Sequence, residues 1–378
     1  MSCFYIDDAL YQENELVREH VALGHNVRVI ASTETMSKEG HLIYGEPHEY
    51  MGSDGAPVKR LPYRKILPQK IMRKLRMHPG VYGEIEAFSP DVIVFHGACG
   101  WEILNASRYS RRHPHVRFWI DSHEDKNNSA RGFVSREGLH KRFYGPLLRR
   151  ALPAGHSVLC ISLETIDFVH EMYGIPLSRL EFFPLGGHPL PDAEYEEMRA
   201  MTRNRLAVNN DQVMFLQSGK FDRKKRLRAT LTAFVATPDP TFRLFLSGVV
   251  MKDEDGNEIQ RLIASDERIT FLGWNSASEM QSLLAASDVY LQPGSQSVTM
   301  QNSICQRCAI VIDDVKSHEP YVRDNGYLTQ AGIDLPNILS DISANKLKIA
   351  TMRERSHALA MQMLDYSKQA LRLAERTS

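Results

Sequence analysis

The sequence lacks the features that mark several common classes of protein. No run of 18 apolar residues occurs, so no transmembrane helix is predicted, and the first residues lack the basic and apolar regions of a signal peptide. The 46 basic and 46 acidic residues cancel, so charge does not favour nucleic acid as a partner. Five cysteines, an odd number, fit reduced thiols better than disulfides. We therefore expect a cytoplasmic protein that binds no nucleic acid.

Two common nucleotide-binding motifs and any strong metal motif are also missing. The chain contains neither a G-x-G-x-x-G dinucleotide fingerprint nor a G-x-x-x-x-G-K-[ST] phosphate loop. Asp253 and Asp255 could be read as a metal clasp, and Cys305 and Cys308 form a C-x-x-C without a second ligand pair. We interpret the first pair as a polar turn and the second as buried thiols, and we expect no metal.

Apolar segments alternate with helix-like segments, a pattern typical of parallel α/β sheets, and 378 residues suit two domains. The Pro- and Gly-rich stretch 183–191 is the predicted linker. Residues 344–378 are predicted to be helical throughout. Strands are predicted at 27–31, 91–95, 116–120 and 157–161, and then at 213–216, 242–246, 269–272, 288–292 and 309–312.

The stretch 219–226 (Gly-Lys-Phe-Asp-Arg-Lys-Lys-Arg) carries five cations between a predicted strand and a helix-like segment. A glycine turn there lets the backbone approach a ligand, and a helix start offers free N–H groups and a positive dipole end. Together they suggest a diphosphate ligand; the alternative is a solvated basic turn. A second strand ends in a Gly/Ser/Thr turn at 293–299, which could cradle the same phosphates.

The order of these and other motifs resembles that of family 4-type glycosyltransferases of the GT-B fold, over nearly the whole chain. The matching elements are the Gly-His-Asn-Val of 24–27, the Phe-Pro-Leu-Gly-Gly of 183–187, Gly219-Lys220 with Lys225, the Phe-Leu-Gly-Trp of 271–274, Pro293-Gly294-Ser295 and the Asn-Gly-Tyr-Leu of 325–328.

The resemblance implies an α/β fold of two facing Rossmann-like domains with an interdomain cleft. Residues 1–187 would bind the acceptor, 188–350 the nucleotide sugar, and 351–378 would be a C-terminal helix packing back on the first domain. It also implies a metal-independent, retaining transferase without a cofactor. The donor would be a nucleotide diphosphate sugar, which we expect to be UDP-linked, and the acceptor a saccharide or lipid-linked saccharide.

The resemblance also assigns residues. Lys220 and Lys225 would neutralise the diphosphate leaving group as its charge grows. The histidine that faces the transferred sugar in the family is matched by His123, which follows the strand at 116–120; a surface histidine with acidic neighbours is the alternative. Strand ends in the acceptor domain add His96, Asp121 and Glu124 as acceptor-side candidates. The predicted donor-binding residues are Gly219, Arg223, Gly294, Ser295, Gln296, Ser297, Thr299, Gln301 and Asn302.

Two departures from the family pattern bear on activity and on the first domain. No Asp or Glu occurs between Asp288 and Asp313, where the family carries two glutamates. This favours the alternative of a catalytically inactive GT-B subunit that binds sugar nucleotide or a partner; another GT-B enzyme class, a nucleotide-sugar epimerase, is a further alternative. Only the short apolar stretch 3–6 precedes the first helix. We therefore expect either a shortened first strand or a start codon that has been assigned too late in the gene.

A basic stretch, 59–76, interleaves eight cations with apolar side chains. This pattern suits an amphipathic segment on an anionic membrane surface, here the inner face of the membrane, where a lipid-linked acceptor could be held. The alternative is a solvated basic face.

Overall fold

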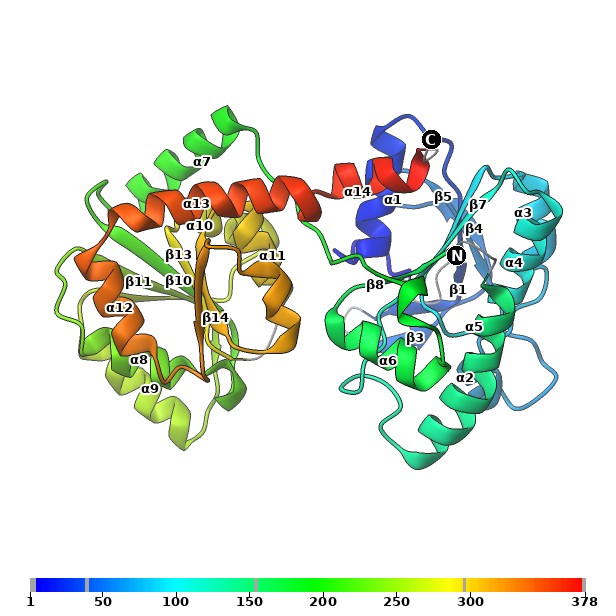
Figure 1. The fold of residues 1–378 in the computed structure, drawn as a ribbon, viewed down its shortest axis with the longest axis horizontal. Helices are drawn as coiled ribbons and strands as arrows, with labels where there is room; N and C mark the ends of the chain where they lie inside the picture. The colour runs from blue at the N-terminus through cyan, green and yellow to red at the C-terminus, as the bar shows by residue number, and fades with distance from the viewer. Residues whose placement is uncertain (1–4, 38–40, 153–155, 295–296, 376–378) are drawn as a thin grey trace. The chain divides into compact units, whose positions relative to one another are not determined.

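The computed structural model describes residues 5–37, 41–152, 156–294 and 297–375. The chain forms two compact units, one of Met1–Pro184 with Tyr366–Ser378 and one of Leu185–Asp365 (Figure 1). The predicted linker therefore contains the first crossing between them. The second crossing lies later than predicted, because residues 351–365 stay with the second unit. Ile349 and Met352, on the helix Leu347–Leu359, are buried in the second unit's core. The helical backbone ends only at Asp365, whose conformation is extended.

The second unit is built on one parallel sheet of six strands in the order β12–β11–β10–β13–β14–β15. In chain order this is 3-2-1-4-5-6, the Rossmann arrangement, in which the first and fourth strands are neighbours. The strands are β10 (Val213–Phe221), β11 (Phe242–Val250), β12 (Ile269–Gly273), β13 (Val289–Gln292), β14 (Ala309–Asp313) and β15 (Gly326–Thr329).

Helices and turns connect these strands, as alternating α/β units require. The largest core cluster of the unit joins Phe215, Leu244, Leu291 and Val311 of the sheet to Leu231 and Leu339 of two helices. The helical segments are α7 (Asp192–Arg205), the 3-10 turn Arg223–Lys225, α8 (Leu227–Val235), α9 (Glu254–Ala264), α10 (Ala277–Ala286), α11 (Val298–Cys305), the 3-10 turn Lys316–Tyr321, α12 (Leu335–Ala344), α13 (Leu347–Leu359) and the π-helical turn Ala360–Leu364.

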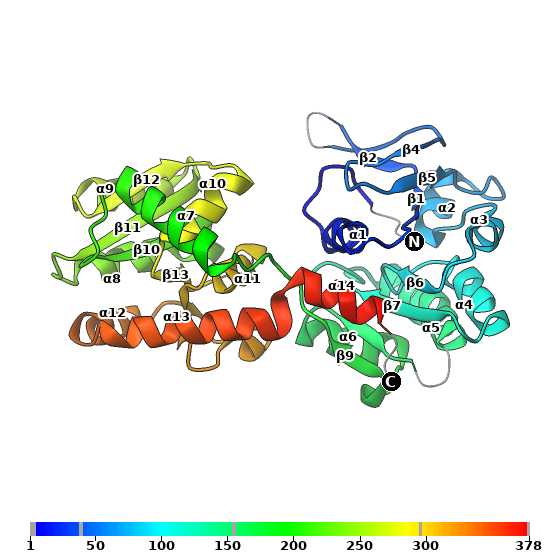
Figure 2. The same cartoon turned by 90° about the horizontal axis from the view of Figure 1, so that it is seen from above.

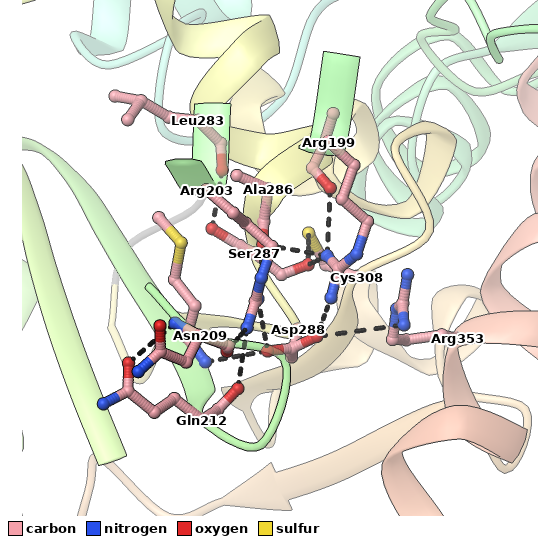
Figure 3. Close-up of polar contacts among 12 residues, drawn as sticks. Arg199, Arg203, Asn209, Gln212, Leu283, Ala286, Ser287, Asp288, Cys308 and Arg353 are labelled. Carbon is pink, nitrogen blue, oxygen red and sulfur yellow. Dashed lines mark hydrogen bonds and ion pairs between the residues drawn. The ribbon is translucent and has the colours of Figure 1, made fainter. Parts of the chain in front are cut away.

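A buried carboxylate fixes α7 and α13 to the start of β13 (Figure 3). Asp288 is paired with the guanidinium groups of Arg199 and Arg203, at 3.0 Å for Arg203, and Arg353 lies 3.8 Å away. The same carboxylate accepts a 2.8 Å hydrogen bond from the backbone N–H of Met214. Burial alone would raise the pKa of Asp288, but the arginines hold it below its usual value.

The first unit contains separate sheets rather than one. Parallel strands β6 (Val92–Phe95), β7 (Arg117–Ser122), β8 (Val158–Cys160) and β9 (Leu180–Phe182) form one sheet in that order. A second sheet has the order β1–β5–β4, and β2 pairs with β3 in antiparallel register. Figure 2 shows β1, β2, β4 and β5 apart from β6 and β7. Their bounds are β1 (Val29–Ser32), β2 (Glu34–Met36), β3 (Leu42–Tyr44), β4 (Glu49–Met51) and β5 (Pro57–Leu61).

Helices complete the first unit. The C-terminal helix α14 returns to it, where Tyr366, Ala370 and Leu373 pack with Leu16 of α1. The helical segments are α1 (Gln12–Ala22), α2 (Gln69–Leu75), α3 (Val81–Phe88), α4 (Ile103–Arg112), the π-helix Val134–Tyr144, α5 (Gly145–Ala151), α6 (Leu163–Tyr173), the 3-10 turn Leu177–Arg179 and α14 (Tyr366–Ala374).

The basic stretch 59–76 is not one amphipathic segment, contrary to the prediction. It runs from strand β5 through a loop into α2, and its buried apolar residues, such as Leu61 and Met72, belong to these two different elements. Arg60 is buried against Asp7 at 2.8 Å, and the guanidinium of Arg73 lies 3.4 Å from the ring centre of Tyr44. Arg76 donates to the carbonyl of Cys99 at 3.1 Å. Several of the predicted membrane cations therefore hold the unit together.

Candidate functional site

The topological switch point of the second unit lies between β10 and β13. In an open parallel sheet, ligands bind outside the carboxyl ends of the strands where the strand order reverses. The loop after β10 is the basic turn, and the loop after β13 leads into α11. The register Phe215↔Val289 and Leu216↔Tyr290 sets the two strands side by side, so both loops leave the same edge of the sheet.

The basic turn begins later than the sequence suggested. Gly219 and Lys220 lie inside β10, which runs to Phe221, because their pairing with Gly248 and Val249 of β11 continues the ladder. The turn proper is Asp222–Arg226, where the Asp222 carboxylate accepts hydrogen bonds from the backbone N–H groups of Lys224 (3.0 Å) and Lys225 (3.2 Å). The predicted glycine turn at 219 is thus a strand end.

Gly219 nevertheless makes the close approach expected of it. Its φ of +136° favours glycine, and a Cβ added there would lie 3.2 Å from Cε and 3.8 Å from Nζ of Lys225. The Lys225 side chain therefore lies along the strand end. Burial lowers the pKa of this lysine, and Asp222 opposes the shift. Lys220 and Arg223 are exposed at the same edge.

Gly294 brings the two loops into contact. A Cβ added to it would lie 2.0 Å from the backbone carbonyl oxygen of Lys224, so only glycine lets the loop after β13 reach the basic turn. The carboxamide of Gln217, on β10, holds the turn by donating a hydrogen bond to the carbonyl of Lys225 at 2.9 Å. The pairing of these two loops builds a compact cationic edge.

A buried hydroxyl network supports the start of α11. The hydroxyl oxygens of Tyr290 and Ser218 are hydrogen-bonded at 2.9 Å, and Ser297 and Thr299 also hydrogen-bond to Tyr290. The Ser297 hydroxyl donates to the Gln292 carboxamide oxygen at 2.6 Å. The sequence analysis missed Ser218, Tyr290 and Gln292; their alternation with apolar residues at strand ends was the available signal.

The remaining predicted donor residues fall into three situations. Ser295 and Gln296 lie outside the described residues. The Gln301 carboxamide lies 3.3 Å from the Tyr321 hydroxyl and, in the orientation that satisfies both of its ends, donates to the carbonyls of Ser297 and Val298. Asn302 lies beside the linker, since a Cβ added to Gly187 would be 2.9 Å from its side-chain oxygen. The Gln301 carboxamide thus has partners within the unit.

In the first unit, a buried carboxylate at the end of β7 gathers two of the predicted histidines. Asp121 contacts Nδ1 of His96 at 2.5 Å, accepts from the backbone N–H of Gly97 at 2.6 Å, and lies 3.6 Å from Nε2 of His123. The parallel strands β6 and β7 bring these residues to one edge, as expected for strand ends.

The charges in this cluster are coupled. Burial would raise the pKa of Asp121, but His96 and His123 hold it well below its usual value. Burial would lower the pKa of His123, yet Asp121 outweighs this effect and raises the pKa to about 9. The side chain of His123 is 33% exposed, while its Nε2, which lies 3.6 Å from Asp121, is buried. The charged imidazolium can donate hydrogen bonds or stabilise negative charge; it is a poor base.

Glu124 and Arg76 extend the cluster. The Glu124 carboxylate accepts from the Ser122 hydroxyl at 2.6 Å and from the backbone N–H of His123 at 3.2 Å. A Cβ added to Gly97 would lie 3.5 Å from the Arg76 guanidinium and 3.8 Å from Glu124, so both side chains reach the same strand end. Arg76 was assigned to the membrane stretch, because sequence spacing does not reveal that α2 ends here in a left-handed residue.

Glu13 at the start of α1 is a further residue that the sequence analysis missed. One ligand atom each of Glu13, His96 and His123 lies within 4.8 Å of the other two, an arrangement that could hold a metal ion. The two weak metal motifs of the sequence have structural roles. Asp253 caps α9 by accepting a hydrogen bond from the N–H of Gly256 at 2.8 Å, and Cys305 and Cys308 are buried thiols.

Comparisons with known proteins agree with this architecture. The sequence model of the glycosyl transferase 4-like domain matches residues 13–186. No curated protein matches the chain in sequence.

Three solved structures share the fold over nearly the whole chain. HepE from Anabaena, solved in complex with UDP, is 16% identical with a TM-score of 0.62, covering 98% of this chain and 97% of its own. WaaG, a glycosyltransferase involved in lipopolysaccharide biosynthesis, is 16% identical with a TM-score of 0.60 and 99% coverage of each chain. Sucrose-phosphate synthase from Thermosynechococcus elongatus is 15% identical with a TM-score of 0.60, covering 98% and 93%.

Residues 13–186 thus match the glycosyl transferase 4-like domain, and the chain as a whole has the GT-B fold of glycosyltransferases. The predicted fold class and the predicted class of enzyme, a glycosyltransferase, are confirmed.

Proposed function

We propose that the chain is a retaining glycosyltransferase that takes a sugar from a nucleotide diphosphate sugar, with the diphosphate bound at the switch point of the second unit. The observation that carries this proposal is the contact between the two loops, in which Gly294 packs on the Lys224 carbonyl while Lys225 lies along Gly219. Cations and helix-terminal N–H groups at one strand edge suit a diphosphate.

Charge stabilisation would be the main contribution of these residues to the rate. As the glycosidic bond to the diphosphate breaks, negative charge grows on the leaving oxygen, and preorganised cations stabilise that charge more than they stabilise the ground state. Lys225 would serve this role with Lys220 and Arg223, and the N-terminus of α11 would add its dipole. UDP is the expected nucleotide, which the UDP complex of the similarly folded HepE supports.

The Asp121 cluster would serve the acceptor side. His123, held charged by Asp121, would donate to a hydroxyl of the transferred sugar or of the acceptor. His96 and Glu124 would hold the acceptor near the end of β7. The resemblance to family 4-type enzymes carries the expectation of retention, which the anomeric proton coupling of a purified product would test.

One observation favours a second candidate, a GT-B subunit that binds nucleotide sugar without turnover. No side-chain carboxylate occurs between Asp288 and Asp313, so amides and hydroxyls stand at the donor edge. UDP release with a panel of nucleotide sugars and saccharide acceptors separates the candidates. Acceptor-dependent UDP release supports the transferase, binding without release supports the subunit, and acceptor-independent epimerisation would indicate the epimerase.

Transfer should not require a divalent cation. We expect full activity in EDTA, because ammonium groups and helix N–H groups would neutralise the diphosphate. Added Zn²⁺ should inhibit, since binding at Glu13, His96 and His123 would need neutral imidazoles and would remove the His123 charge. Loss of activity in EDTA that Mg²⁺ or Mn²⁺ restores, or activation by Zn²⁺, would contradict this expectation.

We also propose that the first unit binds an anionic membrane surface through the loop before α2 and α2 itself. No helix among the described residues is long and apolar enough to cross a bilayer. Lys65, Lys70 and Lys74 are exposed here, and so are the apolar side chains of Ile66, Leu67 and Ile71 between them, with Ile66 70% accessible. Exposed lysines around exposed apolar side chains suit the interface of an anionic bilayer.

Changing Lys65, Lys70 and Lys74 to glutamine should weaken binding to anionic vesicles roughly a hundredfold, at about 1 kcal/mol per cation. Transfer to a soluble acceptor should stay normal. The matched control changes three exposed lysines elsewhere, Lys126, Lys141 and Lys252, and should bind as before. Equal binding of both triple variants in a vesicle sedimentation assay would leave only a solvated basic face.

A further inference from the structure

Three side chains from separate elements of the first unit converge near the end of β7. Glu13 lies in the first turn of α1, His96 follows β6, and His123 follows β7. One ligand atom of each lies within 4.8 Å of the other two, and no other group of three such side chains is found in the described part of the chain. Residues far apart in sequence thus meet at one point of the fold.

The packing of the unit holds these three elements in place. The pairing Phe95↔Ile120 sets the ends of β6 and β7 side by side, so His96 and His123 leave neighbouring strands. Leu16 of α1 packs with Val94 of β6. Residues three apart on a helix lie on the same face, so Glu13 shares the face of α1 that packs on this sheet. The arrangement is therefore set by the core rather than by one loop.

Two of the three groups are buried without the partners that buried polar atoms normally have. Glu13 is 8% exposed, and within the described residues its carboxylate takes part in no hydrogen bond or ion pair. Nε2 of His123 is buried without a hydrogen-bond partner, since the Asp121 carboxylate lies 3.6 Å away. Leaving such atoms unsatisfied costs free energy, so the pair points to a ligand that binds both.

The third group already has the partner that metal-binding histidines use. Nδ1 of His96 contacts the Asp121 carboxylate at 2.5 Å, and the same carboxylate accepts from the backbone N–H of Gly97 at 2.6 Å. A metal-binding histidine donates its other ring N–H to a carboxylate, which fixes the tautomer and the direction of the ring. With Nδ1 donating to Asp121, Nε2 of His96 is the nitrogen left for an ion.

We propose that Glu13, His96 and His123 form a Zn²⁺ site, with Asp121 as the carboxylate behind His96. Imidazole nitrogen suits Zn²⁺, whereas Mg²⁺ and Ca²⁺ take oxygen ligands. Zn²⁺ also has no d-electron preference for one geometry, which selects it among the ions that imidazole suits. Its bonds of about 2.0–2.2 Å place the ligand atoms of one ion roughly 3.3 Å apart, so shifts of about an ångström close the site.

Bound Zn²⁺ would take the acceptor side out of use. Three protein ligands leave a fourth position for water, and the 33% exposed side chain of His123 gives the ion access from solvent. Nε2 of His123 cannot donate a hydrogen bond to a sugar hydroxyl while it binds the ion. This consequence rests on the proposed function, whereas the Zn²⁺ site itself does not.

Isothermal titration of the full chain with Zn²⁺, after metal has been stripped with EDTA and the EDTA removed, tests the site. We expect one Zn²⁺ to bind, and no binding of Mg²⁺ at the same concentrations. Glu13→Gln removes a ligand and should weaken Zn²⁺ binding at least about a hundredfold, because even the loss of an outer partner costs about 10–100-fold. Asp121→Asn should show that smaller loss.

Glu124→Gln is the matched control. Its carboxylate lies in the same cluster, but it accepts from the Ser122 hydroxyl and the backbone N–H of His123 and is not one of the three ligands. It should bind Zn²⁺ as the wild type does. Equal affinities of Glu13→Gln and the wild type, in variants that circular dichroism shows to be folded, would overturn the proposal.

X-ray absorption of the wild type loaded with one Zn²⁺ gives a second test that needs no variant. We expect only nitrogen and oxygen ligands, at about 2.0–2.2 Å. A sulfur shell near 2.3 Å would place the ion at a thiol and would overturn the proposal. Neither measurement uses transfer activity, so failure of the proposed function remains distinguishable from failure of the Zn²⁺ site.

Discussion

Replacing Lys225 with alanine should lower the transfer rate at least about a hundredfold while the fold stays intact, because removing one preorganised charge contact to a transition state costs roughly 3 kcal/mol. The structure strengthens this expectation, since the Lys225 side chain lies along Gly219 and is half-buried at the switch point. The rate is measured as acceptor-dependent release of the nucleotide.

Lys224 offers the matched control. It is adjacent in sequence, carries the same charge and is exposed, and its contribution to the site is its backbone carbonyl against Gly294. Lys224→Ala should therefore keep most of the activity, and Lys225→Arg should keep more than Lys225→Ala. Near-normal turnover in Lys225→Ala would contradict the role of Lys225. Equal losses in Lys224→Ala and Lys225→Ala would mean that the cationic edge acts only through its overall charge.

Replacing Asp288 with asparagine should be the most damaging single change to the stability of the second unit. It leaves the buried Arg203 and the partly buried Arg199 without their counter-ion, and breaking a buried pair in this way costs about 3–5 kcal/mol. The unfolding midpoint of that unit should fall by roughly 6–20 °C, as differential scanning calorimetry would record.

Asp324 provides the control, because its pair with Arg355 leaves its carboxylate 83% exposed. Asp324→Asn should cost less than about 1 kcal/mol. Since the pKa of Asp288 is lowered in the folded state, its contribution is present above the unfolded pKa of about 3.9 and is lost as the pH falls through the folded value. A wild-type unit that loses no more stability in acid than Asp288→Asn would contradict this role.

The sequence predicted the centre of the second unit well because strands β10, β11, β13 and β14 are buried along most of their length and read as apolar runs. Strands at 213–216, 242–246 and 309–312 were found at β10, β11 and β14. The end of β10 was missed because Gly219 and Lys220 resemble a turn locally, whereas pairing with β11 extends the strand. Tertiary pairing of this kind has no local signal.

Side-chain partnerships were the least predictable part of the site. The strand-end rule placed His96 and Asp121 at one edge, but the distance that makes Asp121 hold two imidazoles comes only from the fold. Arg73 and Arg76 were counted as surface cations because charge spacing does not reveal an aromatic or carbonyl partner. The helix expected over 344–378 breaks at Asp365, where the chain leaves the second unit.

The most direct test of the account is the binding of a nucleoside diphosphate against its monophosphate by isothermal titration. The base is the one that a thermal-shift panel of nucleotide sugars selects, with UDP expected. The account predicts that the wild type prefers the diphosphate by about tenfold or more, a difference of about 1.4 kcal/mol, and that Lys225→Ala loses this preference while Lys224→Ala keeps it. Equal affinity of the wild type for both nucleotides would contradict the placement of the diphosphate at the basic turn.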